Sequence, residues 1–92
     1  MNTDHVSFQL GEALLHLQLL VSELREGRVQ EDDTPALAVD LGHILDHICI
    51  AWNARNMSPE AVAALSQDEF ERLTDTVPNF MCSRVLGGDA VC

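Results

Sequence analysis

Lysine is absent from this chain of 92 residues, and its only basic side chains besides four histidines are five arginines. Without lysine there is no Schiff-base nucleophile and no phosphate-binding P-loop lysine, and no glycine-rich phosphate loop is present either. Fifteen Asp and Glu residues bring the formal net charge to −10. Such a chain repels phosphates and has few cations with which to displace counterions from nucleic acid. We therefore expect no direct binding of DNA or RNA.

Aromatic residues are also scarce, at 4% of the chain, with three Phe, one Trp and no Tyr. Apolar residues nevertheless make up 47%, so the expected core is aliphatic and the composition favours helices. A chain of this length forms one domain, here taken as residues 1–92, and buries only about 60 to 65% of its unfolded surface. Its margin of stability is therefore expected to be thin.

Long apolar runs are missing, and no stretch approaches the roughly 18 residues of a membrane span. The first residues, Met1 to Asp4, lack the basic and apolar regions of a secretory signal. We therefore predict a cytoplasmic protein without membrane contact. Three cysteines without CxxC spacing indicate neither a disulfide framework nor a zinc ribbon. We expect Cys49, which lies in an apolar helical pattern, to be a small core residue.

Helical periodicity dominates two long segments. The first is expected from Thr3 or Asp4 to Glu26, with Gly27 as its stop, and the second from a Thr34 cap to about Asn56. Pro35 would occupy the first helical position of the second segment. The expected buried faces are Val6, Leu10, Leu14, Leu17, Val21 and Leu24, widened by Ala13 and Leu20, on the first helix, and Leu37, Leu41, Ile44, Leu45, Ile48 and Trp52 on the second.

Shorter helices are expected after residue 57. Ser58 and Pro59 open one that runs to about Leu65, and the capping box of Ser66 and Glu69 opens another that runs to about Thr76. A last helix over Asn79–Leu86 and a loose tail over Asp89–Cys92 complete the prediction. No strand pattern is present. The predicted fold is all-α, with two long amphipathic helices and two or three short ones in a small bundle, and we expect it to form a dimer.

Acidic and imidazole side chains recur at helical spacing in both long segments. Asp40, His43 and His47 fall on one side of the second, and Glu12 and His16 could meet them from the first. Facing helices of this kind can hold zinc or iron. No HExxH motif accompanies them, and DxxHxxxH arises by chance in many helices. The interpretation we favour is that the histidines are half-buried and bonded to Asp40, Glu12 or backbone, with no cofactor; a metal site is the alternative.

A second apolar strip lies on another side of the first helix. It consists of Phe8, Leu15 and Leu19, and on the second helix Val39 and Ile50 are expected to be an additional exposed apolar pair. A helix that is apolar on two sides needs two surfaces to pack against, which a second copy of the chain would supply. The acidity around this strip suits a basic protein partner. We therefore expect a homodimer.

Catalytic signatures are weak throughout. There is no Gly-x-Ser-x-Gly turn, and no basic partner can be assigned to Cys49. We expect a small acidic protein-interaction or regulatory module and not an enzyme. Two alternatives stay open, namely the metal-binding bundle and an acidic mimic of nucleic acid that blocks a basic partner.

Overall fold

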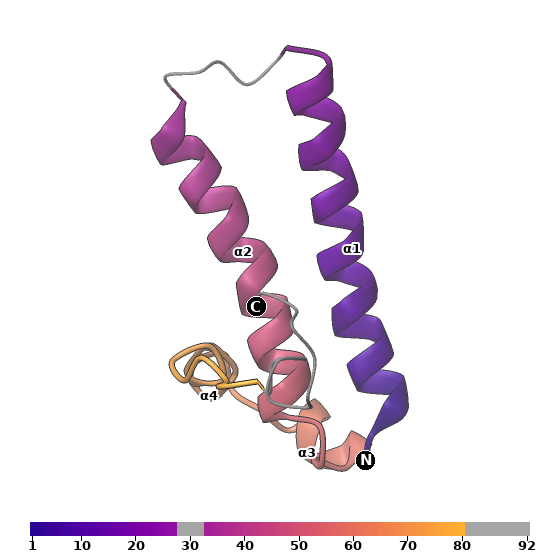
Figure 1. The fold of residues 1–92 in the computed structure, drawn as a ribbon. Coiled ribbons are helices and arrows are strands. Elements are labelled where there is room, and N and C mark those ends of the chain that lie inside the picture. Colours follow the sequence, from indigo (N-terminus) through magenta and orange to yellow (C-terminus); the bar gives the residue numbers. More distant parts are fainter. Residues whose placement is uncertain (28–32, 81–92) are drawn as a thin grey trace, which may run out of the picture.

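Two long helices lie side by side and antiparallel in the computed structural model, which describes residues 1–27 and 33–80 (Figure 1). They are α1 (Thr3–Arg25) and α2 (Thr34–Asn53), and two short helices follow, α3 (Pro59–Ala63) and α4 (Gln67–Arg72). No strand occurs among the described residues. The predicted all-α class, with two long helices followed by short ones, is confirmed. None of the described helices is long and apolar enough to cross a membrane.

The N-terminal end of α1 is tied to the end of α2 by Asn2. Its Oδ1 atom accepts a hydrogen bond from the His5 amide at 3.1 Å, which caps α1. Its own amide donates to the Arg55 carbonyl at 2.6 Å, and its Nδ2 donates to the Met57 carbonyl at 3.0 Å. At the other end of α1, Gly27 has a φ of 73°, the left-handed conformation expected of a glycine stop.

The boundaries of α2 differ from the prediction. Asp33, not Thr34, is its N-cap residue, and Thr34 already belongs to the helix, so the predicted Thr34 cap is wrong. Pro35 still lies in the first turn, where a missing amide proton costs nothing. The helix ends at Asn53, three residues before the predicted Asn56.

Both short helices begin where their capping residues predicted. The Ser58 hydroxyl accepts from the Ala61 amide, and Ser66 and Glu69 form a reciprocal capping box. Each helix is shorter than expected, since α3 ends at Ala63 and α4 at Arg72. Asn79 and Phe80 are not helical. The rest of the predicted Asn79–Leu86 helix, and the predicted tail Asp89–Cys92, lie outside the described residues.

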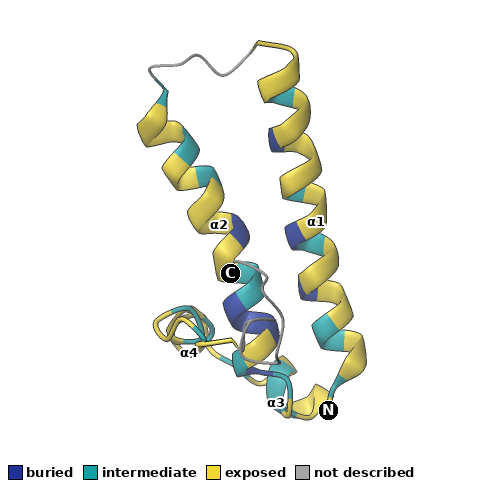
Figure 2. Cartoon of the chain, viewed as in Figure 1, coloured by how far each residue is buried: buried dark blue, intermediate teal, exposed yellow. Residues whose placement is uncertain are grey.

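The buried core between α1 and α2 is narrow (Figure 2). It consists of Ala13, Leu20 and Ile44, with Leu37 and Ile48 partly buried against them. The line of contact on α1 continues through Gln9, which is only 3% exposed. We call this line the seam. The seam contains few buried side chains, one of them the small Ala13, so it buries little apolar area.

Most of the predicted buried stripe is not buried, and this part of the prediction is wrong. On α1 the exposed residues are Leu10, Leu14, Leu17, Val21 and Leu24, and on α2 they are Leu41, Leu45 and Trp52. The physical reason is that the apolar arc of α1 is wider than the strip a single neighbouring helix can cover. α2 covers one edge of that arc, and the leucines on the other edge stay in contact with solvent.

The last turns of α2 have neighbours on more than one side. Asn53 Nδ2 donates to the carbonyls of Leu73 and Thr76, at 2.7 and 2.9 Å, so the chain after α4 is tied back to α2. Cys49 is 1% exposed, which confirms its expected core position. Ile50 is 4% exposed, so its expected place on an exposed interface is wrong. Phe8, Leu15, Leu19 and Val39 are exposed, as expected.

The narrow seam generates the first prediction. Ile44→Ala should lower the free energy of unfolding by about 2 to 4 kcal/mol, because it removes one of three buried core side chains and leaves a cavity. Urea unfolding followed by circular dichroism measures this loss. Val39→Ala is the matched control, since Val39 is 71% exposed on the same helix and should change the value by less than about 0.5 kcal/mol. Equal losses in the two variants would contradict the described core.

Candidate metal centre

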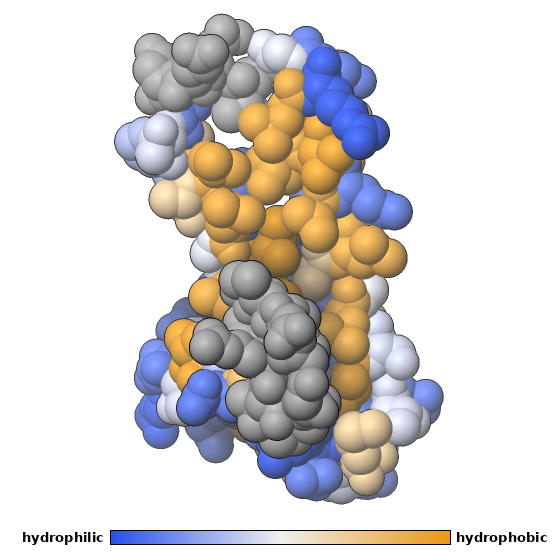
Figure 3. All heavy atoms as spheres, in the orientation of Figure 1, coloured by the Kyte–Doolittle hydropathy of each residue, from blue (hydrophilic) through white to orange (hydrophobic). Residues whose placement is uncertain are grey.

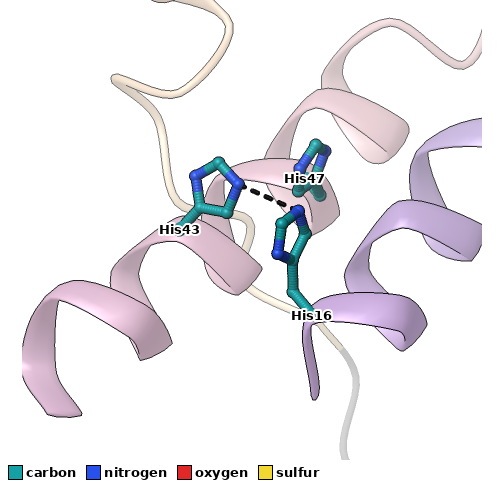
Figure 4. A group of neighbouring side chains, drawn as sticks. All are labelled: His16, His43 and His47. Atoms are coloured by element: carbon teal, nitrogen blue, oxygen red, sulfur yellow. Dashed lines mark hydrogen bonds between the residues drawn. The ribbon is translucent and has the colours of Figure 1, made fainter. Parts of the chain in front are cut away.

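Three histidines from the two long helices meet across one edge of the seam (Figure 4). His16 projects from α1, and His43 and His47 project from successive turns of α2. One ring nitrogen from each histidine can be chosen so that all three atoms lie within 4.8 Å of one another. Among the described residues, this group is where potential metal ligands converge.

One pair within this histidine trio already has the spacing of two ligands around one ion. The Nε2 atoms of His16 and His43 lie 3.2 Å apart. Two nitrogens bound to one tetrahedral zinc ion, each at about 2.0 to 2.1 Å, would lie roughly 3.3 Å apart. The rings of His43 and His47 are edge-on, with centroids 4.9 Å apart, while those of His16 and His47 are nearly parallel at 5.5 Å. Since the chosen nitrogens of the trio lie up to 4.8 Å apart, the rings would have to rotate and close in for all three to bind one ion.

Gln9 forms a hydrogen bond with His47, the third histidine of the trio. Its Oε1 atom lies 2.7 Å from Nδ1 of His47, and Gln9 is the one polar residue buried among the described residues. Because an amide oxygen only accepts, Nδ1 of His47 carries the proton and donates it. The neutral ring then has a free lone pair on Nε2. Metal-binding histidines are commonly oriented by such an outer partner, which selects the tautomer and the ring direction.

Electrostatics also favour the neutral form of His47. Burial lowers the pKa of His47, and the neighbouring His43 and His16 lower it further. The Glu12 and Asp46 carboxylates act in the opposite direction but do not reverse the shift. Since only a neutral imidazole can bind a metal ion, this environment reduces the competition from protons near neutral pH.

Of the five residues predicted as ligands, the structure brings three together. Asp40 and Glu12 are partly buried, and they are not members of the converging group. Asp40 lines the groove beside the trio together with Glu23 and Val39. The preferred interpretation from sequence, that the histidines bond to Asp40, Glu12 or backbone, is not what the structure shows, because His16 and His43 contact each other and His47 contacts Gln9.

Gln9 is the site residue that the sequence interpretation missed. One signal could have found it, because Gln9, Ala13, His16 and Leu20 recur at spacings of three and four and so share one side of α1. A glutamine on the same side as a candidate ligand is a possible orienting group.

Comparison with known proteins adds no relative. No protein-family model matches the chain, and neither a curated protein nor a solved structure matches it. The interpretation of the histidine trio therefore depends on its own geometry.

The lowered pKa of His47 generates the second prediction. Titration of the histidine ring resonances by NMR should place the pKa of His47 below its ordinary value of 6.5. His43→Ala should raise it partway, since burial, the larger cause, persists, whereas Glu12→Gln should lower it further. The folded protein then binds fewer protons than the unfolded chain just below pH 6.5, so stability should fall as the pH drops through this window. A pKa of His47 at or above 6.5 would contradict the described burial.

Proposed function

We propose that this chain binds one divalent transition-metal ion of the zinc class between its two long helices. The observation that carries the proposal is the convergence of three imidazoles, one of them oriented by a buried glutamine. Imidazole is a ligand of borderline-soft ions such as zinc, copper, nickel and ferrous iron, whereas calcium and magnesium prefer oxygen. Zinc and iron, the ions considered from sequence, both belong to this class.

The surroundings of the trio favour a cation. Glu23 and Asp40 line the adjacent groove, and Glu12 lies close enough to act on the charge of His47. Together with the net charge of −10, these carboxylates raise the local concentration of cations. Three protein ligands leave one position of a tetrahedral site for water, a carboxylate or a ligand from a partner. Because His43 is exposed, that position would be accessible from solvent. The absence of enzymatic activity stays a prediction.

The third prediction tests the metal directly. Protein purified without a histidine tag and titrated with zinc by calorimetry should bind one ion per chain. His16→Ala, His43→Ala and His47→Ala should each weaken the affinity more than about a hundredfold, which exceeds the usual effect of losing an outer partner. His5→Ala is the matched control, because His5 is the fourth histidine on the same two helices and is not part of the trio.

The result that would overturn the metal proposal is specific. If the wild-type protein takes up none of zinc, nickel and copper, the histidine trio is not a metal site. The same holds if His5→Ala weakens binding as much as the trio variants do. Circular dichroism of each variant should show that the helices persist, so that a loss of binding reports on the ligand and not on unfolding.

The fourth prediction concerns Gln9. Gln9→Ala keeps all three ligands but removes the acceptor for Nδ1 of His47. Zinc affinity should fall by about ten- to a hundredfold, less than for loss of a ligand. Gln18→Ala is the control, since Gln18 is exposed on the same helix. An unchanged affinity in Gln9→Ala would show that Gln9 does not orient His47.

A second candidate function is docking to another protein surface, in keeping with an interaction or regulatory module. Many large apolar side chains of both long helices are exposed, and they support this proposal. Contiguous exposed apolar surface on a small protein commonly marks an interface. A homodimer, a basic partner and a cytoplasmic location belong to this proposal. The net charge supports the remaining alternative, an acidic mimic of nucleic acid that blocks a basic partner.

A further inference from the structure

Exposed apolar residues gather on one side of the hairpin and cover both long helices (Figure 3). We call this surface the leucine face. Its exposed members are Leu10, Leu14, Leu17, Val21 and Leu24 of α1 with Leu41, Leu45 and Trp52 of α2. It is a different surface from the Phe8, Leu15 and Leu19 strip that the sequence indicated.

The leucine face and the histidine trio lie on opposite sides of the seam. One apolar groove is lined by Leu10 of α1 and Trp52 of α2, together with Val6 and Ile48. The α1 part and the α2 part of the leucine face therefore border each other. The groove beside the histidines is lined instead by Leu19 and Val39, with His16 and His43. At 100° per residue, Leu10 and Leu17 fall about 100° and 80° to one side of Gln9, and Leu19 falls about 80° to the other.

The spacing along each helix is that of a bundle seam with two neighbours. On α1, residues 10, 13, 17, 20 and 24 alternate in steps of three and four, and every second one belongs to the buried seam while the others are exposed. On α2, residues 37, 41, 44 and 48 show the same steps, with Leu41 exposed and Ile44 buried. In a four-helix bundle each helix packs against two others along such a pattern. Among the described residues, α1 and α2 supply each other with only one of these two neighbours.

The leucine face offers many apolar side chains to a partner. Its eight large members are each between 36% and 55% exposed, and contact with a second copy would remove them from water.

Charge favours a second copy over a basic partner on this face. No acidic residue lines the two described grooves on the leucine face, and their charged residues are Arg25 and Arg55. The carboxylates of Glu23 and Asp40 line the groove on the opposite face. Two copies can therefore meet through the leucine faces without burying carboxylates, while a basic partner would find no acidic rim there.

We infer that the leucine face pairs with the leucine face of a second copy around a two-fold axis, so that two hairpins form a four-helix bundle. The histidine trios then lie on the outer sides of the dimer. This inference rests on the docking function and is independent of the metal proposal.

Sedimentation equilibrium of the full chain under reducing conditions tests the pairing. Wild-type protein at tens of micromolar should sediment at twice its monomer mass of 10.1 kDa. Leu14→Glu should shift the dissociation constant at least a hundredfold towards monomer. Leu15→Glu is the matched control, because Leu15 is 49% exposed on the strip predicted from sequence and Leu14 is 55% exposed on the leucine face. Zinc binding should survive in both variants.

Trp52 supplies a second measurement that needs no substitution. It is the single tryptophan and lies 44% exposed on the leucine face. Diluting the wild-type dimer should shift its emission to the red and increase quenching by acrylamide, because dissociation returns the indole to water. If the protein dissociates on dilution without a change in Trp52 emission or quenching, the leucine face is not the dimer interface. This conclusion holds even if Leu14→Glu fails to fold.

The remaining outcomes separate the pairing from the docking function. A dimer that Leu15→Glu disrupts at least as strongly as Leu14→Glu overturns the leucine face as the interface. A wild-type monomer overturns the pairing altogether. If that monomer binds an apolar dye such as ANS, the face is free for a different protein and docking survives. If it does not bind the dye, the face is covered within the chain and docking fails as well.

Discussion

The close approach of α1 and α2 along a narrow seam is the constraint on which the rest of the structure depends. Ala13 and Leu20 of α1 meet Ile44 of α2 there, and little else between the two helices is fully buried. Because the seam uses few side chains, it positions the helices without covering their apolar arcs. The same register brings His16 opposite His43 and His47. The candidate metal centre and the exposed leucine face therefore have one geometric origin.

The two sides of the hairpin differ in chemistry. One side carries the histidine trio, with Glu23 and Asp40 lining the neighbouring groove. The other carries leucines, and its grooves contain no acidic residue. A net charge of −10 is thus compatible with an apolar surface that a second copy could approach. Separation of charge from apolar area lets one small hairpin offer two independent kinds of binding surface.

Metal binding and pairing through the leucine face would each compensate for the small amount of apolar area buried within one chain. A metal ion held by α1 and α2 would link the helices and stabilise the folded state according to its concentration and affinity. Pairing through the leucine face would bury area that the hairpin alone leaves in water. Metals and oligomers are common ways of completing the core of chains below roughly 70 to 80 residues, and this hairpin, with its few buried side chains, has the same need.

The local elements followed from local chemistry. Gly27 ended α1, and the capping box of Ser66 and Glu69 began α4, because capping bonds join residues only a few positions apart. The end of α2 was less predictable, since Asn53 bonds to carbonyls twenty or more residues away. Candidate ligands on each helix could likewise be named in advance, because helical spacing alone puts His43 and His47 on one side.

The sequence by itself determined that two long apolar-sided helices form, which residues share a side, and which side chains could bind metal. Only the tertiary structure decided which edge of each apolar arc is buried, because hydrophobic periodicity gives the direction of the arc and not the neighbour that covers it. It selected Gln9 for the seam, left Leu14 and Leu17 outside, and buried Ile50. It also joined three histidines and excluded Asp40 and Glu12 from the group, since the register between two helices depends on contacts far apart in the chain.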